Sequence, residues 1–432
     1  MNKYSPYHEG ECSLTHSVCS MIIESIGGKK MKKEKVFIVG AKRSAIGGFM
    51  GTLKKVHPRD MGAQVLSQLL EETNLPKDKI SEVIMGNILS AGLGQGIARQ
   101  ISIDSGIPES VPAYSLNMMC GSGMKAIMNA YTGIRDGFSD IVVAGGVESM
   151  TRAPYLVDGK VRTGSKLGAM TMEDHILKDA LVDVFGDIHM GITAENIAEK
   201  YNISRKDQDE FAMASQTRAI KAIDSDRFKD EIVPIEFSTR KGKVVFDTDE
   251  HPNRTTTPEI LAKLRPAFKK DGTVTAGNSS GINDGTSFTI IASGSAVKTY
   301  DLPVLAEVTH IAQAGVDPNY MGMGPVPAIE TLCQDAGLKL DDIDLVELNE
   351  AFAAQSLGVI RKLANIFETT EKDIREKTNV NGGAIALGHP VGISGNRIVV
   401  TLLHEMIKRD DNVGLASLCI GGGMGTALII KR

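Results

Sequence analysis

Three glycine-rich segments of this chain each contain one side chain that can take part in thiol chemistry. Cys120 lies in the segment Asn117-Met-Met-Cys-Gly-Ser-Gly123, Cys419 opens a second segment, and His389 lies in a third, residues 381–395. Glycine loses more backbone freedom on folding than other residues, so it gathers where the chain turns sharply or approaches another group closely. Two thiols and one imidazole in such bends predict covalent catalysis by a cysteine, with a second thiol nearby.

The predicted nucleophile is Cys120, because a helical pattern follows it directly. The positive end of a helix dipole lowers the pKa of a cysteine and populates the reactive thiolate. His389 is the expected base for Cys120. Cys419 is expected to act as a general acid and base, and the backbone N–H of Gly421 is expected to bind an oxyanion. The alternative for each side chain is a buried structural role.

Two further polar segments are candidates for the same site. Asn349 ends a predicted strand, where its amide can hold a water molecule or orient a carbonyl, although an Asx turn that caps the next helix is the alternative. Residues 275–285 are rich in glycine and small polar groups, and they can cradle a pantetheine or a phosphate through backbone contacts. A plain loop is the alternative for that segment.

Composition excludes several classes of function. The chain has 432 residues, 23% of them charged, and a net charge of −5, which favours neither nucleic acid nor an anionic membrane as a partner. Its apolar runs are far shorter than the ~20 residues that span a bilayer. The five cysteines have no compact spacing, so we expect free thiols, a reducing compartment and a cytoplasmic location. Neither a CxxC nor an HExxH motif occurs, so no metal site is expected.

Short apolar runs that alternate with amphipathic patterns predict an α/β architecture. The predicted strands are Val36–Val39, Glu82–Met85 and Ile141–Ala144, and the predicted helices are Asp60–Thr73 and Gly123–Asp136. Regular patterning begins at Met31, so residues 1–30 are expected to form an N-terminal extension or a disordered tail.

The chain also repeats itself. Residues 78–87 resemble residues 341–349, 36–39 resemble 304–308, and 141–146 resemble 414–422, in the same order. Such a series predicts two similar halves that pack as a pseudo-symmetric pair. The predicted domains are 31–151 with 282–302, a substrate-covering loop domain at 152–281 in which Ser204 caps a helix, and 303–432.

Together these segments resemble the thiolase family. The resemblance covers residues 34–432 and rests on four motifs: residues 117–123, Asn349-Glu-Ala-Phe-Ala353, Asn381-Gly-Gly-Ala-Ile-Ala-Leu-Gly-His-Pro-Val-Gly392 and Cys419-Ile-Gly-Gly-Gly-Met-Gly425. It implies a duplicated αβαβα layered fold with an inserted loop domain.

The resemblance also implies roles for individual residues. Cys120 would carry the acyl group, with His389 as its base, and Cys419 would move a proton at C2 of a second acyl-CoA. One oxyanion hole would use His389 and a water held by Asn349, and the other would use the N–H groups of Cys120 and Gly421. The residues implied to contact the substrate or CoA are Ser280, His189, Met190, Met321, Arg254 and Phe352.

The activity that the resemblance implies is the reversible condensation of two acetyl-CoA to acetoacetyl-CoA and CoA. CoA and its thioesters would be substrates, with no bound cofactor. A homotetramer built as a dimer of dimers is expected, with residues 152–178 as the assembly loop. The alternatives are a degradative 3-ketoacyl-CoA thiolase of broader chain length and a non-catalytic acyl-CoA or lipid-binding relative. A decarboxylating ketosynthase is disfavoured, because such enzymes lack the second cysteine.

Overall fold

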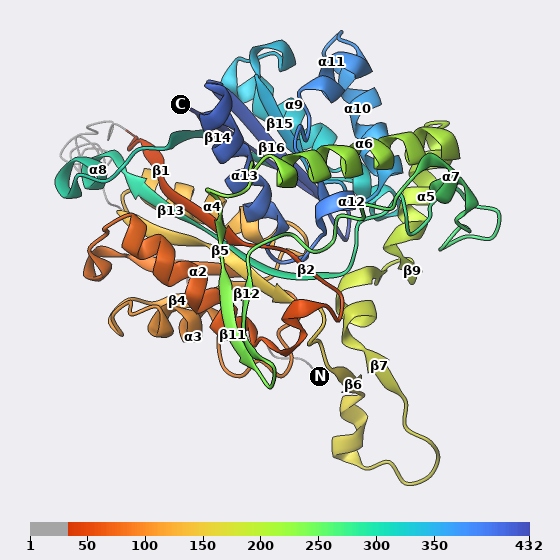
Figure 1. The fold of residues 1–432 in the computed structure, drawn as a ribbon, viewed down its shortest axis with the longest axis horizontal. Helices are drawn as coiled ribbons and strands as arrows, with labels where there is room; N and C mark the ends of the chain where they lie inside the picture. Colours follow the sequence, from red (N-terminus) through yellow and green to blue (C-terminus); the bar gives the residue numbers. More distant parts are fainter. Residues whose placement is uncertain (1–32) are drawn as a thin grey trace, which may run out of the picture. The chain divides into compact units, whose positions relative to one another are not determined.

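The computed structural model describes residues 33–432, of which Glu34–Arg432 form one compact unit (Figure 1). The predicted extension, residues 1–30, lies outside the described residues. Within them, no helix combines the length and the apolar character that crossing a bilayer requires.

A mixed sheet of eleven strands forms the centre of this unit. Its main path runs β4–β3–β5–β13–β1–β14–β17–β16–β15, with β10 beside β1 and β2 beside β13. The strands are β1 (Val36–Ser44), β2 (Gly47–Gly48), β3 (Glu82–Gly86), β4 (Ala113–Leu116), β5 (Ile141–Ser149), β10 (Ile232–Val233), β13 (Asn283–Ser293), β14 (Ala306–Gly315), β15 (Leu345–Leu348), β16 (Val413–Ile420) and β17 (Met424–Lys431). Every residue of β5 and β13 is buried, because helices cover both faces of the sheet.

The strand order is symmetric about the pairing of β1 with β14. On one side β13, β5 and β3 follow β1, and on the other side β17, β16 and β15 follow β14, with the same sequence of antiparallel and parallel pairings. The three pairs of similar segments fall on β3 and β15, β5 and β16, and β1 and β14. The predicted duplication of the fold is therefore confirmed.

The helices form three layers, a central one between the two halves of the sheet and one on the outer face of each half. The helices of the two halves are α2 (Pro58–Glu72), α3 (Ile97–Asp104), α4 (Ser122–Arg135), α8 (Gly294–Tyr300), α9 (Pro325–Ala336), α10 (Ala353–Ile366), α11 (Glu371–Glu376), α12 (Ala384–Leu387) and α13 (Ser394–Arg409). Helices α4 and α13 pack against each other, α4 on strands of the first half and α13 on strands of both halves, whereas α2 and α9 each pack on the strands of one half. The three largest apolar clusters are accordingly one central cluster and two outer ones.

The two predicted helices begin earlier than their patterns suggested. Helix α2 begins at Pro58 and not at Asp60, because the His57 ring accepts from the N–H of Arg59 and proline suits the first helical position. Helix α4 begins at Ser122, one residue before the predicted start.

The segment between β5 and β13 includes residues 152–281, for which a loop domain is predicted. Its elements are β6 (Tyr155–Val157), β7 (Met172–Asp174), β8 (Val182–Asp183), β9 (Ile188–His189), α5 (Met190–Lys200), α6 (Arg205–Asp224), β11 (Ile235–Thr239), β12 (Gly242–Phe246) and α7 (Pro258–Lys263). Ser204 caps α6 as predicted, in a capping box with Asp207, so two backbone donors at the start of this helix are satisfied. Helix α5 packs against α10, which brings the insertion over the second half of the fold.

Candidate active site

Cys120 stands in the turn between β4 and α4. The preceding residue, Met119, has a φ of 48°. This left-handed conformation costs a residue with a side chain roughly 1–2 kcal/mol. Ser122 stabilises the turn, because its hydroxyl accepts from the N–H of Met118 at 2.8 Å and donates to the carbonyl of Met119 at 2.7 Å. The chain thus holds a strained backbone next to the candidate nucleophile.

The environment of the Cys120 thiol differs from the sequence-based expectation. Burial raises its pKa to about 11, and this effect outweighs the N–H groups of Gly421 and of Cys120 itself, which lower the pKa. Burial acts in this direction because it disfavours the charged thiolate. The prediction that the start of the helix populates the thiolate is therefore wrong for the resting protein. Removal of the thiol proton requires a base.

His389 is held from two sides in the loop between α12 and α13. Its backbone N–H donates to Oδ1 of Asn283 at 2.9 Å, and Nδ1 lies 2.6 Å from the hydroxyl of Ser394. Ser394 donates its own proton to the carbonyl of Pro390, so it accepts from Nδ1. Nε2 is then unprotonated. Burial, with a smaller effect of Arg397, lowers the pKa of His389 to about 4, which keeps the ring neutral and able to accept a proton.

Cys419 lies near the end of β16, just before a tight turn into β17. Gly422 and Gly423 have φ values of 83° and 85°. Residues with side chains rarely adopt such values. The Cys419 side chain is buried, and burial together with the nearby Cys120 raises the pKa of its thiol. The thiol is therefore protonated in the resting state, and its thiolate can exist only with charge compensation in the site.

Asn349 follows β15 and is almost fully buried. Neither Oδ1 nor Nδ2 of its amide has a hydrogen-bond partner among the described residues. A buried amide without partners costs about 1–3 kcal/mol, so such groups in folded proteins usually bind water or take part in function. The Asx turn that was the alternative is not formed, since this amide bonds to no backbone group.

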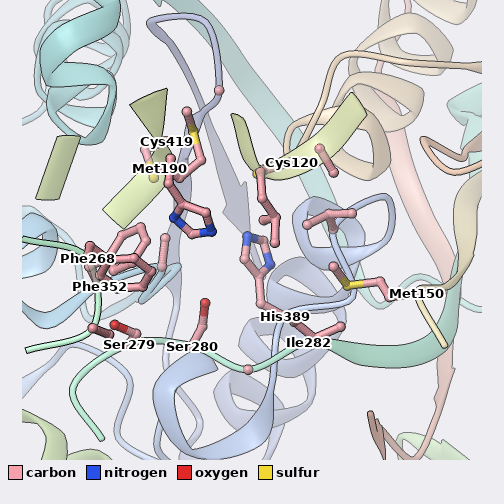
Figure 2. A pocket seen from close by; sticks show the side chains of 18 of the residues that line it. Cys120, Met150, Met190, Phe268, Ser279, Ser280, Ile282, Phe352, His389 and Cys419 are labelled. Carbon is pink, nitrogen blue, oxygen red and sulfur yellow. The ribbon is translucent and has the colours of Figure 1, made fainter. Parts of the chain in front are cut away.

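Most of the predicted residues meet in one cavity of about 380 Å³. Figure 2 shows Cys120, His389 and Cys419 projecting into it, with Ser280 and Phe352 on its wall. The remaining predicted residues that line it are Gly421, His189, Met190 and Met321. Two predicted residues are not among its lining residues: Asn349, and Arg254, whose guanidinium forms two hydrogen bonds with Asp224 on α6. The assignment of Arg254 to the substrate stays a prediction.

Several lining residues were not named individually in the sequence analysis. Six of them lie inside predicted segments: Ala276, Ser279, Gly281 and Ile282 in 275–285, Ala351 in 349–353 and Val391 in 381–392. The others lie outside all of these segments: Met150, Ala180, Leu181, His251, Ala267 and Phe268. Phe268 stacks on His189 with 4.7 Å between ring centroids and meets Phe352 edge to face, two arrangements that aromatic rings favour. These side chains belong to the insertion, to the ends of strands or to loops, where no periodicity marks them. Some of them could have been predicted because they are close in sequence to a predicted residue.

The cavity wall is mostly apolar, with few polar groups directed into it. The Nδ1 of His189 accepts from the N–H of Gly191, and burial lowers the pKa of this ring. Among residues 33–432, no group of three or more His, Cys, Asp or Glu side chains is arranged to hold a metal ion. The chemistry that this arrangement supports is nucleophilic thiol catalysis with acid–base assistance, in a largely apolar cavity.

Comparison with known protein families gives two matches that together cover nearly all of the described chain. Residues 36–295 match the model "Thiolase, N-terminal domain" and residues 302–432 match "Thiolase, C-terminal domain". The acetyl-CoA acetyltransferase of Pseudomonas aeruginosa is 51% identical over 400 residues, which cover 92% of this chain and 100% of that protein. The acetyl-CoA acetyltransferase of Escherichia coli is 51% identical over 395 residues, 91% of this chain and 98% of that protein.

Solved structures resemble this fold closely. The crystal structure of the Bacillus anthracis acetyl-CoA acetyltransferase is similar with a TM-score of 0.88 and 43% identity, over 92% of this chain and 99% of that one. The crystal structure of human mitochondrial 3-ketoacyl-CoA thiolase is similar with a TM-score of 0.87 and 44% identity, again over 92% and 99% of the two chains.

Proposed function

This chain belongs to the thiolase family, and from that premise we propose that it is an acetyl-CoA C-acetyltransferase. It would condense two acetyl-CoA to acetoacetyl-CoA and CoA, and catalyse the reverse thiolysis, through an acyl group on Cys120. The observation that carries the proposal is the convergence of Cys120, His389 and Cys419 in one cavity. Two thiols around one neutral imidazole match a reaction that moves protons at both carbon and sulfur.

In the first half of the reaction, the unprotonated Nε2 of His389 takes the proton of the Cys120 thiol. The sulfur then attacks the thioester carbonyl of acetyl-CoA, and the N–H groups of Cys120 and Gly421 stabilise the oxyanion. A donor of this kind is typically worth about 3 kcal/mol to the transition state. The bond to the CoA sulfur breaks, His389 returns its proton to that sulfur, and CoA leaves.

In the second half, a second acetyl-CoA binds beside acetyl-Cys120. His389 takes the proton of Cys419, and the resulting thiolate removes a proton from C2 of the substrate. Protonated His389 and a water on Asn349 stabilise the enolate oxygen. The carbanion attacks the acetyl carbonyl, the bond to the Cys120 sulfur breaks, and His389 supplies the proton for that sulfur. Acetoacetyl-CoA leaves, and both thiols and the neutral imidazole are restored.

The dimensions of the cavity favour a short acyl group. Met190 and Met321 are both buried in its wall, and the other apolar residues close it further. A CoA thioester supplies its own leaving group, so no bound cofactor is needed. Ser280 is assigned to the pantetheine arm, His189 and Met190 to the acyl pocket, and Phe352 to contact with the substrate or CoA. The specific alternative is a 3-ketoacyl-CoA thiolase of broader chain length, which the similarity to the human mitochondrial enzyme favours.

The test is CoA-dependent thiolysis of acetoacetyl-CoA and of a long-chain 3-ketoacyl-CoA at matched concentrations. A kcat/KM at least tenfold higher for acetoacetyl-CoA supports the proposal. Equal or faster turnover of the long chain would replace it with the broader thiolase. If neither substrate is cleaved, the chain is a binding protein of this fold.

We also propose a cytoplasmic homotetramer, a dimer of dimers, assembled through residues 152–178. The support is that this segment exposes large apolar side chains, which a partner surface would cover. They are Tyr155, Val157, Val161, Leu167, Met170, Met172 and Leu177. Light scattering of the full chain, and of a chain with residues 159–171 replaced by a short glycine-serine linker, tests this assembly.

A further inference from the structure

One fully buried carboxylate beside the catalytic loops takes no part in the mechanism above. Glu148 lies near the end of β5, with none of its surface exposed. Its Oε1 accepts from Nδ2 of Asn87 and from the N–H of Leu89, each at 3.1 Å. Its Oε2 accepts from the N–H groups of Ile88 and Gly392, each at 3.0 Å. No salt bridge of the described chain includes it, so its hydrogen bonds all come from uncharged N–H donors.

These donors come from both halves of the fold. Residues 87–89 follow β3 in the first half, which also carries Cys120, whereas Gly392 lies three residues after His389 in the second half. Glu148 is therefore a direct link between the loop of the base and the half that carries the nucleophile. Hydrogen bonds to an ionised group are roughly twice as strong as neutral ones, so the link resists displacement.

Glycines bring the His389 loop close enough for this link. A Cβ on Gly86 would lie 2.5 Å from the carbonyl oxygen of Gly392, and a Cβ on Gly146 would lie 2.7 Å from it. A Cβ on Gly392 itself would lie 2.4 Å from Oε2 of Glu148. Such distances are far below van der Waals contact, so the loop packs directly on the ends of β3 and β5, with Glu148 as the group that bonds it there.

We propose that Glu148, in its ionised form, is a positioning residue that holds the His389 loop in register with Cys120. An ionised carboxylate accepts from all four donors, whereas a protonated one must turn an O–H toward an N–H group and lose a bond. The inference rests on the proposed function only for the identity of the reaction. Any reaction in which His389 takes the proton of Cys120 requires that the two side chains be aligned.

The titration of Glu148 then has a defined consequence. Burial raises its pKa to about 7, although the N–H groups of Ile88, Leu89 and Gly392 oppose the shift. The other titratable groups that face it are Asp284 on β13 and the Cys120 thiol. Since the pKa is higher in the folded chain than the ordinary 4.5, protonation of Glu148 does not favour unfolding. Because the protonated carboxyl gives up a hydrogen bond to the loops, reactivity should fall below pH 7 while the fold persists, although loss of the Glu148 charge by itself lowers the pKa of Cys120.

The test measures alkylation of Cys120 by iodoacetamide between pH 5.5 and 8.5, followed by mass spectrometry of the Cys120 peptide in the full-length protein. Glu148→Gln keeps the shape but places an NH₂ group against N–H donors. We expect its rate at pH 8 to fall about 10–100-fold, the scale of a small misplacement of catalytic groups. Below pH 7, a plot of log alkylation rate against pH should be steeper for the wild type than for the variant, by a slope of one.

Glu195→Gln is the matched control. Glu195 is also buried, and its hydrogen bonds likewise come from uncharged groups. These groups are the N–H groups of Thr273 and Val274 and the Thr273 hydroxyl, none of which belongs to the loops of Cys120 or His389. Its alkylation profile should match the wild type within about twofold. If Glu148→Gln lowers the thermal midpoint as Glu195→Gln does but keeps the wild-type rate and slope, Glu148 is only structural and the proposal is wrong.

A second variant keeps the proposal testable if Glu148→Gln does not fold. Asn87→Ala removes one of the four donors, so the pKa of Glu148 should rise and the steep part of the wild-type profile should move to higher pH. An unchanged profile would contradict the proposal. Alkylation uses no CoA ester, so its outcome is independent of the thiolysis assay. The KM for acetoacetyl-CoA should stay within about twofold in Glu148→Gln, because the residue does not line the cavity.

Discussion

The Nδ1 nitrogen of His389 and the hydroxyl oxygen of Ser394 are 2.6 Å apart, and both groups are buried. Because Ser394 donates to the carbonyl of Pro390, this contact fixes the tautomer in which Nε2 of His389 is free to accept the Cys120 proton. The first residue of α13 thereby sets the protonation pattern of the base, five residues away in the sequence.

Ser394→Ala should lower the rate of Cys120 acylation at saturating acetoacetyl-CoA by about 10–100-fold, because the imidazole loses its preferred tautomer and orientation. KM should change little, since Ser394 does not line the cavity. Rapid-quench measurement of acetyl-enzyme formation tests this. Ser105→Ala is the control, since this buried hydroxyl also donates to a backbone carbonyl, but at the end of α3. Equal rates in the two variants would remove the role assigned to Ser394.

Cys419→Ala should keep the acylation of Cys120 and lose the carbon–carbon bond chemistry. The smaller side chain leaves the backbone donor at Gly421 in place but removes the group that takes the C2 proton. We expect stoichiometric labelling by radioactive acetyl-CoA and condensation slower by on the order of 10³-fold, a scale typical of lost acid–base catalysis. Cys120→Ser serves as the opposite control, without acetyl-enzyme. Wild-type condensation in Cys419→Ala would exclude this thiol as the acid–base group.

Asn349→Ala should separate stability from activity. The amide of Asn349 has no partner among the described residues. Its removal should therefore cost less than the roughly 1–3 kcal/mol that deletion of a bonded buried polar group costs. Condensation should nevertheless slow by about 10²-fold, since an oxyanion donor is lost. Thermal unfolding and steady-state kinetics of the same preparation measure the change in stability and the change in kcat. A large loss of stability together with normal kcat would show that the amide is structural.

The buried His389 should make the folded chain sensitive to acid. Its pKa is lowered to about 4 from 6.5, so the unfolded chain binds more protons between these values. The stability that this group contributes is complete above pH 6.5 and is lost as the pH falls toward 4, by an amount on the order of 3 kcal/mol. Urea unfolding at pH 7, 5.5 and 4.5 measures it. His389→Asn should show a flatter dependence than wild type, and equal slopes would contradict the assignment.

Much of the site was predictable from local sequence, because glycine-rich loops around Cys120, His389 and Cys419 mark backbone that must bend or pack closely. Four residues predicted from these loops do line one cavity: Cys120, His389, Cys419 and Gly421. Five more that only the family resemblance implied line it as well: Ser280, His189, Met190, Met321 and Phe352. The other lining residues, such as Phe268 and Met150, could not be identified, because their positions depend on how the insertion packs against α10 and the strand ends.

The electrostatic state of the site was the part that local sequence predicted wrongly. A cysteine before a helix suggests a lowered pKa, yet burial raises the pKa of Cys120 to about 11. Desolvation depends on every segment that covers the thiol, and most of these segments are far away in the sequence. For the same reason, nothing in the sequence around residue 148 indicated that Glu148 would accept hydrogen bonds from two different loops.

The sequence by itself determined the alternation of strands and helices, the duplication of the halves and the identity of the reactive groups, since these are written in short-range patterns and repeated segments. Only the tertiary structure decided that both thiols are protonated at rest, which nitrogen of His389 is free, and which side chains close the cavity. Those properties arise from burial and from hydrogen bonds between residues such as Glu148 and Gly392, which the chain brings together only when both halves have folded.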